Sequence, residues 1–284
     1  MDFAKLQNIV GTIPRFQTYT RTRIAQLWVP GGPSMQAFKD HTLTGAMMNE
    51  AEEFIDRAIV LFLLRLGLRT NKYSTWADVS IYYANYFLAG AFQRICLSSF
   101  THGSTSATTR GNYSIAPNTH DFFEHQITLR NRPFNHVEMW DSYYKTIDAF
   151  SWANGPSKDS LLPPASKPEW AHRERKFREE RNYTPGQGFQ ELYQTDRRYF
   201  SEMAPLGTIN MSQNRAALDE SEYCDRSAHD RIVYLLKLLR ALESRRIDPE
   251  FDVQRRQIRL NLISKYATKK TEENHFIAVI QGRK

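Results

Sequence analysis

The sequence predicts a mainly α protein: a helical bundle with short extended segments near both termini. Apolar residues recur every three or four positions through several long stretches, which is the period of a helix buried on one side. Ser-, Thr-, Gly- and Pro-rich stretches separate these periodic segments and are expected to be loops. Hydrophobic residues make up 41% of the 284 residues and charged residues 24%, which is the balance of a globular protein with a core.

The first part of the chain combines an extended segment with two long helices. Residues 1–40 are expected to be partly extended, because 18–29 mixes β-branched and aromatic residues with arginine and is followed by a Gly-Gly-Pro turn. The apolar spacing predicts one helix over 42–68 and a second over 76–97, which Thr75 starts with Asp78 as an acidic capping box. Small residues on the second helix would let another helix pack closely, so a homodimer is predicted through Ala84, Ala89, Gly90 and Ala91.

The rest of the chain alternates between predicted loops and helices. Ser, Thr and Gly dominate 99–119, which predicts a long surface loop, and 152–168 is predicted to be a linker. Helices are expected over 133–150, 168–182, 187–202, 218–246 and 249–267, with a terminal strand over 275–280. The clearest helix has an apolar stripe formed by Ile232, Leu235, Leu236, Leu239 and Leu242. The expected domains are an N-terminal segment 1–40, a helical core 41–205 and a C-terminal extension 206–284.

The charge distribution favours an anionic partner. The net charge is +7 and the pI is about 9.3, and aromatic residues make up 13% of the chain. Basic residues form two groups: Arg173, Arg175, Lys176, Arg178 and Arg181, then Arg240, Arg245, Arg246, Arg255, Arg256 and Arg259. Clustered cations beside aromatic rings suit nucleic acid, through phosphate attraction and base stacking. The alternative is a solvated basic face that docks on an acidic protein.

One short stretch, 130–136, carries the groups needed for metal-independent RNA cleavage. Arg130 and Asn131 precede His136, and these three residues are the candidate catalytic set. A histidine can accept the proton of a ribose 2′-hydroxyl or donate one to the leaving oxygen. An arginine can hold the phosphate and stabilise its developing charge. The alternative interpretation is a histidine at a helix start beside surface arginines.

A metal site and other catalytic motifs receive little support. On a helix, "HDFFEH" at 120–125 would place His120 and Glu124 on one face, yet the HExxH spacing of zinc enzymes is absent. No metal or cofactor is therefore expected. Neither a phosphate-binding GxxxxGK[ST] loop nor a GxSxG nucleophile elbow occurs.

The tyrosine- and alanine-rich segment 81–95, the amphipathic segment 136–147 and "REERNYT" at 178–184 together resemble the HEPN superfamily of helical, mostly dimeric proteins. The resemblance covers roughly 42–200, and Arg178, Arg181 and Asn182 match the family's Arg-x-x-Arg-Asn element. It implies a role in toxin–antitoxin or antiviral systems, with two copies of this element lining one cleft. The family's active branch has a histidine after the element, whereas here Tyr183, Thr184 and Pro185 follow, so the resemblance implies binding without cleavage.

The sequence therefore leaves three functions open. The first is an HEPN-like subunit of a larger assembly that binds RNA or DNA through Arg173, Arg175, Lys176, Arg178, Arg181, Asn182, Tyr183, Arg255, Arg256 and Arg259. The second is a metal-independent ribonuclease that uses Arg130 and His136, and the third is a protein scaffold without nucleic-acid contact. A cytoplasmic location is expected, because the longest apolar run, 58–64, is too short for a membrane span and only two cysteines occur.

Overall fold

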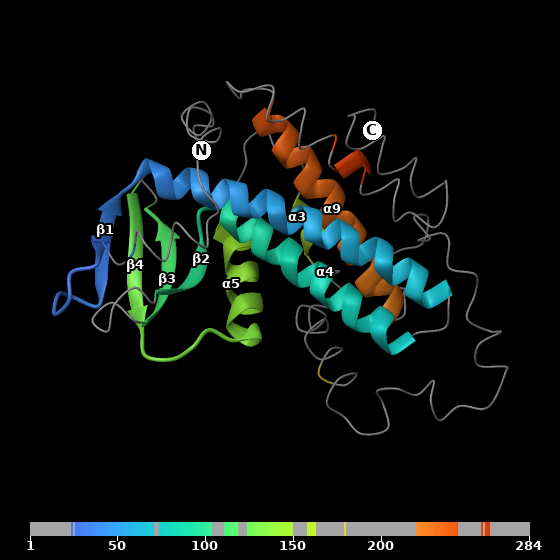
Figure 1. Ribbon diagram of the computed structural model, residues 1–284, viewed down its shortest axis with the longest axis horizontal. Helices are drawn as coiled ribbons and strands as arrows, with labels where there is room; N and C mark the ends of the chain where they lie inside the picture. The colour runs from blue at the N-terminus through green and yellow to red at the C-terminus, as the bar shows by residue number, and fades with distance from the viewer. Residues whose placement is uncertain are drawn as a thin grey trace. The chain divides into compact units, whose positions relative to one another are not determined.

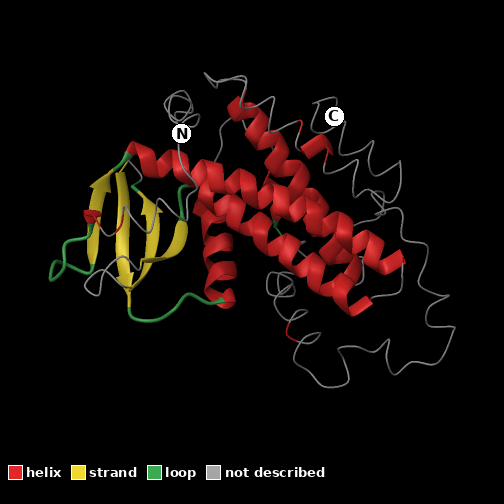
Figure 2. Cartoon of the chain, viewed as in Figure 1, coloured by secondary structure: helices red, strands yellow, loops and turns green. Residues whose placement is uncertain are grey.

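The computed structural model confirms a mainly α protein and adds a four-stranded sheet that the sequence did not predict (Figure 2). It describes residues 24, 26–70, 74–103, 111–118, 124–149, 158–162, 179, 220–243, 257 and 259–261. In chain order the elements are β1 (Met35–Lys39), α3 (His41–Thr70), α4 (Ser74–Ile95), β2 (Ser99–Gly103), β3 (Gly111–Pro117), β4 (Glu124–Arg130), α5 (His136–Ala149), η1 (Lys158–Leu161) and α9 (Glu220–Glu243). The helices predicted over 42–68, 76–97, 133–150 and 218–246 are thus confirmed as α3, α4, α5 and α9.

The chain divides into two compact units, each built from segments that are distant in sequence. Unit 1 holds the described residues up to Phe54, those between Gly90 and 149, and 241–243. Unit 2 holds the described residues of 55–89, 158–240 and 257–261. The expected domains 1–40, 41–205 and 206–284 are contiguous, whereas α3 and α4 each supply residues to both units.

The sheet of unit 1 has the strand order β1-β4-β3-β2, with all neighbours antiparallel (Figure 1). The prediction of a loop over 99–119 was wrong for Ser99–Gly103 and Gly111–Pro117, which form β2 and β3. Only alternate side chains of β3 are buried, Tyr113 and Ile115, so the segment lacks the apolar run of a fully buried strand. The other residues of β2 and β3 include Ser, Thr and Gly, so the sequence of these strands has the composition of a loop.

One face of the sheet packs against the hydrophobic core of unit 1. The start of α3 and a short helical segment near Ile24 form the other side of this core. Trp28 lies edge-on to Tyr113, with 5.3 Å between ring centroids. This core consists of Ile24, Trp28, Leu43, Ala46, Met47, Leu97, Tyr113, Ile115 and Ile127, with Phe38 packed against it. Residues 24, 26 and 27 are helical, so the extended conformation predicted for 18–29 was wrong at these positions.

Specific turn and cap residues fix the ends of these elements. Gly31 has a φ of 77° in the turn from Val29 to Gly32, where the Gly32 N–H donates to the Val29 carbonyl at 3.2 Å, so the predicted turn is confirmed. Asp40 caps α3, since its Oδ1 accepts the N–H groups of Thr42 and Leu43.

Leu97 ends α4 in the left-handed conformation, with a φ of 58°. The Ser98 N–H bonds the Gln93 carbonyl and the Leu97 N–H bonds the Arg94 carbonyl, which is the paired arrangement of a Schellman motif. Glycine is the usual residue at this position. Leu97 occupies it because its fully buried side chain belongs to the core of unit 1.

In unit 2, α9 lies against the later part of α3 and the earlier part of α4 (Figure 1). The predicted stripe is buried at Ile232, Leu235, Leu236 and Leu239, and the side chain of Leu242 lies outside the described residues. The small residues of α4 are buried inside the chain, and a Cβ on Gly90 would lie 3.0 Å from the Phe54 ring. These residues already serve packing within one chain, and the homodimer stays a prediction.

The remaining predicted elements lie outside the described residues. They are the body of the linker 152–168, the helix over 187–202 and the terminal strand over 275–280. Of the helices expected over 168–182 and 249–267, the structure describes only Glu179, Gln257 and 259–261, all helical.

Candidate nucleic-acid interface

The candidate catalytic residues lie where β4 turns into α5, in unit 1. Arg130 is the last residue of β4, Asn131 is exposed in the turn that follows, and His136 is the half-buried first residue of α5. We call Arg130, Asn131, Arg132, Phe134, Asn135, His136 and Glu138 the β4–α5 corner. The five turn residues 131–135 therefore lie between Arg130 and His136 along the chain.

Asn135 and Glu138 form a capping box that starts α5. The Glu138 N–H donates to Asn135 Oδ1 at 3.0 Å, and the Asn135 N–H donates to Glu138 Oε2 at 3.3 Å. The Met139 N–H donates to the Asn135 carbonyl at 3.1 Å. The cap fixes the position of the Glu138 carboxylate at the end of β4.

The second oxygen of Glu138 binds two arginines. Arg130 Nη2 lies 2.5 Å from Glu138 Oε1, and Arg132 Nη2 lies 2.9 Å from the same oxygen. The two arginines differ in accessibility, because the Arg130 side chain is 17% exposed and that of Arg132 is 73% exposed. Arg130 is therefore held inside the corner, while Arg132 presents its cation to solvent.

Two phenylalanines complete the environment of Arg130. The rings of Phe100 from β2 and Phe134 from the turn stack, with centroids 3.9 Å apart and planes at 14°. The Arg130 guanidinium carbon lies 5.2 Å and 5.9 Å from these two centroids, within the range of a cation–π interaction. Arg130 Nη1 is buried and has no hydrogen-bond partner among the residues that the structure describes, so Arg130 is anchored by a carboxylate and two rings.

The arginines also set the protonation of Glu138. Its partial burial alone would raise the pKa, but hydrogen bonds from Arg130 and the Asn135 N–H, with the charges of Arg130 and Arg132, lower the pKa below its usual value. Glu138 is therefore ionised at neutral pH. The corner then carries two cations against one anion before any charge on His136 is counted.

This arrangement bears on the ribonuclease hypothesis. A catalytic arginine must turn its guanidinium to the phosphate, and that of Arg130 is already engaged by Glu138. A phosphate at Arg130 would have to displace this carboxylate. Arg132, which the sequence analysis did not select, is the arginine that an anion can reach directly.

The predicted nucleic-acid-binding residues are described in the structure only at Arg259. Arg259 is 1% exposed, and its Nε donates to Asp56 Oδ1 at 2.7 Å. The prediction of a phosphate contact was wrong for this residue, because its cation is buried and neutralised within unit 2. The other predicted residues lie outside the described part of the chain: Arg173, Arg175, Lys176, Arg178, Arg181, Asn182, Tyr183, Arg255 and Arg256.

The helical arrangement considered for "HDFFEH" does not form at Glu124 and His125, which begin β4. His125 is fully buried, and its Nε2 lies 3.0 Å from Thr44 Oγ1 and 3.2 Å from the Asp40 carbonyl oxygen. Because a carbonyl only accepts, the contact with Asp40 assigns the proton to Nε2. Within the described ranges no three His, Cys, Asp or Glu side chains gather as metal ligands would.

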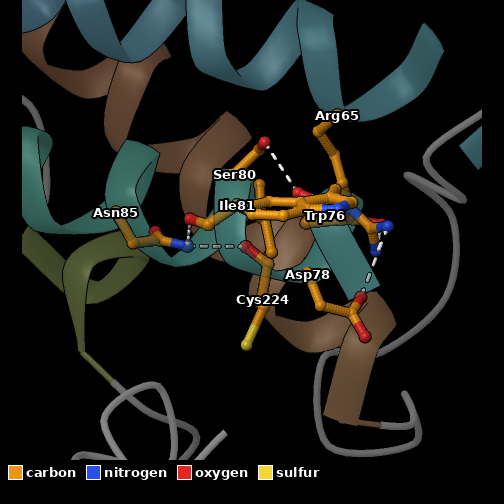
Figure 3. Close-up of polar contacts among 8 residues, drawn as sticks. Arg65, Trp76, Asp78, Ser80, Ile81, Asn85 and Cys224 are labelled. Carbon is orange, nitrogen blue, oxygen red and sulfur yellow. Dashed lines mark hydrogen bonds and ion pairs between the residues drawn. The ribbon is translucent and has the colours of Figure 1, made fainter. Parts of the chain in front are cut away.

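Unit 2 contains a second polar cluster that the sequence analysis did not identify (Figure 3). The fully buried Arg65 makes a bidentate pair with Asp225, at 2.8 and 3.1 Å, and its Nη1 lies 3.4 Å from Asp78 Oδ1. Burial by itself lowers the pKa of Arg65, but Asp225 and Asp78 more than offset this effect and raise the pKa. This guanidinium joins α3, α4 and α9 as a charged cross-link.

Asn85 makes a further link in the same cluster. Its Nδ2 donates to the carbonyls of Ile81 and Cys224, at 3.2 and 3.0 Å, and its Oδ1 accepts Arg231 Nη1 at 2.6 Å (Figure 3 shows the two carbonyl contacts). Asn85 is fully buried and Arg231 is 1% exposed. No polymeric ligand can reach such groups, so the cluster stabilises unit 2 and is not a binding site.

Among the described helices, none combines the length and the apolar character that a bilayer crossing requires. Protein-family models, curated proteins and solved structures yield no match to the chain.

Proposed function

We propose that this chain is a nucleic-acid-binding protein and that the β4–α5 corner is one of its contact surfaces. The observation that carries the proposal is Arg132, whose side chain is 73% exposed and pairs with Glu138 Oε1, the same carboxylate oxygen that holds Arg130. An exposed guanidinium attracts phosphate, and the stacked Phe100 and Phe134 rings, which lie against Arg130, add an aromatic surface to the same corner. The net charge of +7 adds a long-range attraction for a polyanion.

The proposal keeps the HEPN-like resemblance and the role in a larger assembly as predictions. Their motif, at Arg178, Arg181 and Asn182, belongs to the part of the chain outside the described residues. Support for nucleic-acid binding comes instead from the corner and the overall charge. In this proposal Arg130 and Glu138 position the corner, and Arg132 contacts phosphate.

The test is a binding titration with fluorescently labelled RNA and DNA at several salt concentrations. Arg132→Ala is expected to weaken binding about fivefold and to lower the slope of log affinity against log salt by about one phosphate contact, roughly 0.7 to 0.9. Lys145→Ala is the matched control, because Lys145 is an exposed cation on α5 outside the corner. Arg132→Lys keeps the charge and should keep most of the salt slope.

The same titration separates the alternatives. RNA that stays intact in EDTA and binds with salt-dependent affinity supports binding without cleavage. Cleavage that is lost in His136→Ala would instead establish the ribonuclease. The absence of binding to either nucleic acid at low salt would overturn the proposal in favour of the scaffold hypothesis.

A further inference from the structure

The outer face of the four-stranded sheet is polar and accessible. The side chains on this face alternate with those of the core, and each is exposed or half-buried where the structure describes its exposure. They come from β1 (Met35, Ala37, Lys39), β4 (Glu124, Gln126, Thr128, Arg130), β3 (Asn112, Ser114, Ala116) and β2 (Phe100). A face with this composition cannot form an apolar layer against another protein, because amide and hydroxyl groups occupy its centre.

The strand register arranges these side chains in rows across the sheet. One row is Ala37–Gln126–Ala116, so the Gln126 amide stands between two exposed alanines. The next row is Met35–Thr128–Ser114–Phe100, with two hydroxyls at its centre. Small neighbours leave the backbone surface open on both sides of Gln126, so a planar ring can lie flat against the sheet there.

Basic side chains stand at both ends of β4 on this face. Lys39 pairs in register with Glu124 at one end, and Arg130 with Asn112 at the other, where Arg132 of the β4–α5 corner adds an exposed cation. The acidic groups Glu124 and Glu138 lie at the same two ends. With Lys39, Arg130 and Arg132 these groups leave one net positive charge beside a neutral, hydrogen-bonding centre.

We propose that this face binds single-stranded nucleic acid, with bases on the Ala37–Gln126–Ala116 row and on Thr128 and Ser114 of the next row, and phosphates toward the basic ends. This inference rests on the proposed nucleic-acid binding and names the form of nucleic acid bound. A glutamine amide can pair with two edge groups of an adenine, and hydroxyls accept or donate to any base. The Phe100–Phe134 stack offers a ring to the terminal base.

The dimensions of the face favour a single strand over a duplex. Seven residues of β4 span about 20 Å, and four strands span about 14 Å in the perpendicular direction. The major groove of a duplex admits a helix or a two-stranded ribbon, so a flat four-stranded face is too wide to enter it. Unpaired bases can instead be laid out on a sheet and read from their edges.

The test uses the full-length protein and oligonucleotides of about ten nucleotides, as single strands and as duplexes of the same sequence. Ala37→Glu and Ala116→Glu each place a carboxylate on the central row and are expected to weaken single-strand binding at least about tenfold, through repulsion of phosphate and obstruction of the bases. Ala149→Glu is the identical substitution at an exposed position of α5 away from the sheet and should leave the affinity unchanged. Thermal melting establishes that each variant is folded.

A second measurement does not depend on variants. Single-stranded RNA with photoreactive 4-thiouridine is crosslinked to the unmodified protein, and crosslinked peptides are expected from β3 and β4. Binding that favours duplex, equal affinities for Ala116→Glu and Ala149→Glu, or crosslinks confined to other segments would each overturn this inference while leaving nucleic-acid binding intact. Loss of all binding at low salt would overturn the proposed function as well, so the two failures are distinguishable.

Discussion

Glu138 holds Arg130 across the turn from β4 to α5, with 2.5 Å between Oε1 and Nη2. The same carboxylate caps α5 and binds the exposed Arg132, so it serves the fold and limits the positive charge of the surface. Removing the carboxylate should lower the stability of the fold but raise the affinity of the surface for nucleic acid. The consequences for stability and for binding can therefore be measured separately.

Glu138→Gln is expected to destabilise the protein and to strengthen nucleic-acid binding. Glutamine keeps the capping box but loses the charge-assisted bonds to both arginines, which costs about 1–2 kcal/mol of unfolding free energy. One negative charge fewer should raise affinity at low salt roughly threefold, and this gain should fade as salt screens the interaction. Asp148→Asn removes an exposed carboxylate from the other end of α5 and serves as the control. An unchanged affinity in Glu138→Gln would show that the corner does not contact nucleic acid.

The contribution of Glu138 to stability should depend on acid pH. Its pKa in the folded protein lies below the unfolded value of about 4.3. The stabilisation is therefore complete above that value and is lost as the pH falls through the folded pKa. Urea unfolding of the native sequence and of Glu138→Gln, measured from neutral to acid pH, should give free energies that differ most above the unfolded pKa and converge as the pH falls below it. A difference between them that stays constant over this range would contradict the assignment.

Arg65→Met should destabilise unit 2 strongly. The substitution leaves the carboxylates of Asp78 and Asp225 near each other in a buried site without their cation, and the expected loss is about 3–5 kcal/mol. Replacing both aspartates by asparagine in the same variant should recover part of the loss, because the unpaired charges are then removed. Denaturant titration of the three proteins measures both effects. No recovery in the triple variant would mean that the cost arises from packing rather than charge.

Leu97 offers a test of backbone strain against burial. Leu97→Gly relieves the left-handed conformation but loses a fully buried side chain, so it should be less stable than the native protein. Leu97→Ala loses most of the side chain and keeps the strain, so it should be less stable than Leu97→Gly by about 1 kcal/mol. Alanine is more stable than glycine at ordinary helical positions, and the reversed order identifies the conformational cause. Thermal melting of both variants gives this order.

Both described cysteines should resist modification in the native protein. Cys96 is fully buried, and this burial raises the pKa of its thiol well above the usual value, while Cys224 is 1% exposed. A thiolate is the reactive form, so a disulfide reagent such as DTNB is expected to react only after urea unfolds the chain. Rapid reaction of either thiol in native buffer would contradict this burial.

The sequence predicted the helices because each buries a broad apolar stripe. The stripe of α9, for example, repeats at Ile232, Leu235 and Leu239, all fully or almost fully buried. The sheet was missed because only one of its faces is buried, and β3 places Asn112, Ser114 and Ala116 on the other. A strand with two buried residues and a polar outer face has the composition of a surface loop.

The sequence predicted only the part of the candidate site that local sequence neighbours identify. Arg130 was selected from its neighbours in sequence, whereas Glu138, the carboxylate that immobilises it, was not selected. The signal for Glu138 was present, since Asn135 followed three residues later by an acidic residue is the spacing of a capping box. The Phe100 contact could not be predicted, because it depends on β2 lying beside β3 and on the turn folding back over the sheet.

The order of strands in the sheet also determines when each part can form. β2, β3 and β4 are consecutive in the chain, so they can pair as a local meander soon after collapse. β1 joins β4 only after a loop containing α3 and α4 has closed, and closing that loop costs more conformational entropy than a hairpin turn. The row that includes Ala37 is therefore completed late in folding. In hydrogen exchange, the amides between β1 and β4 should open at lower free energy than those between β3 and β4.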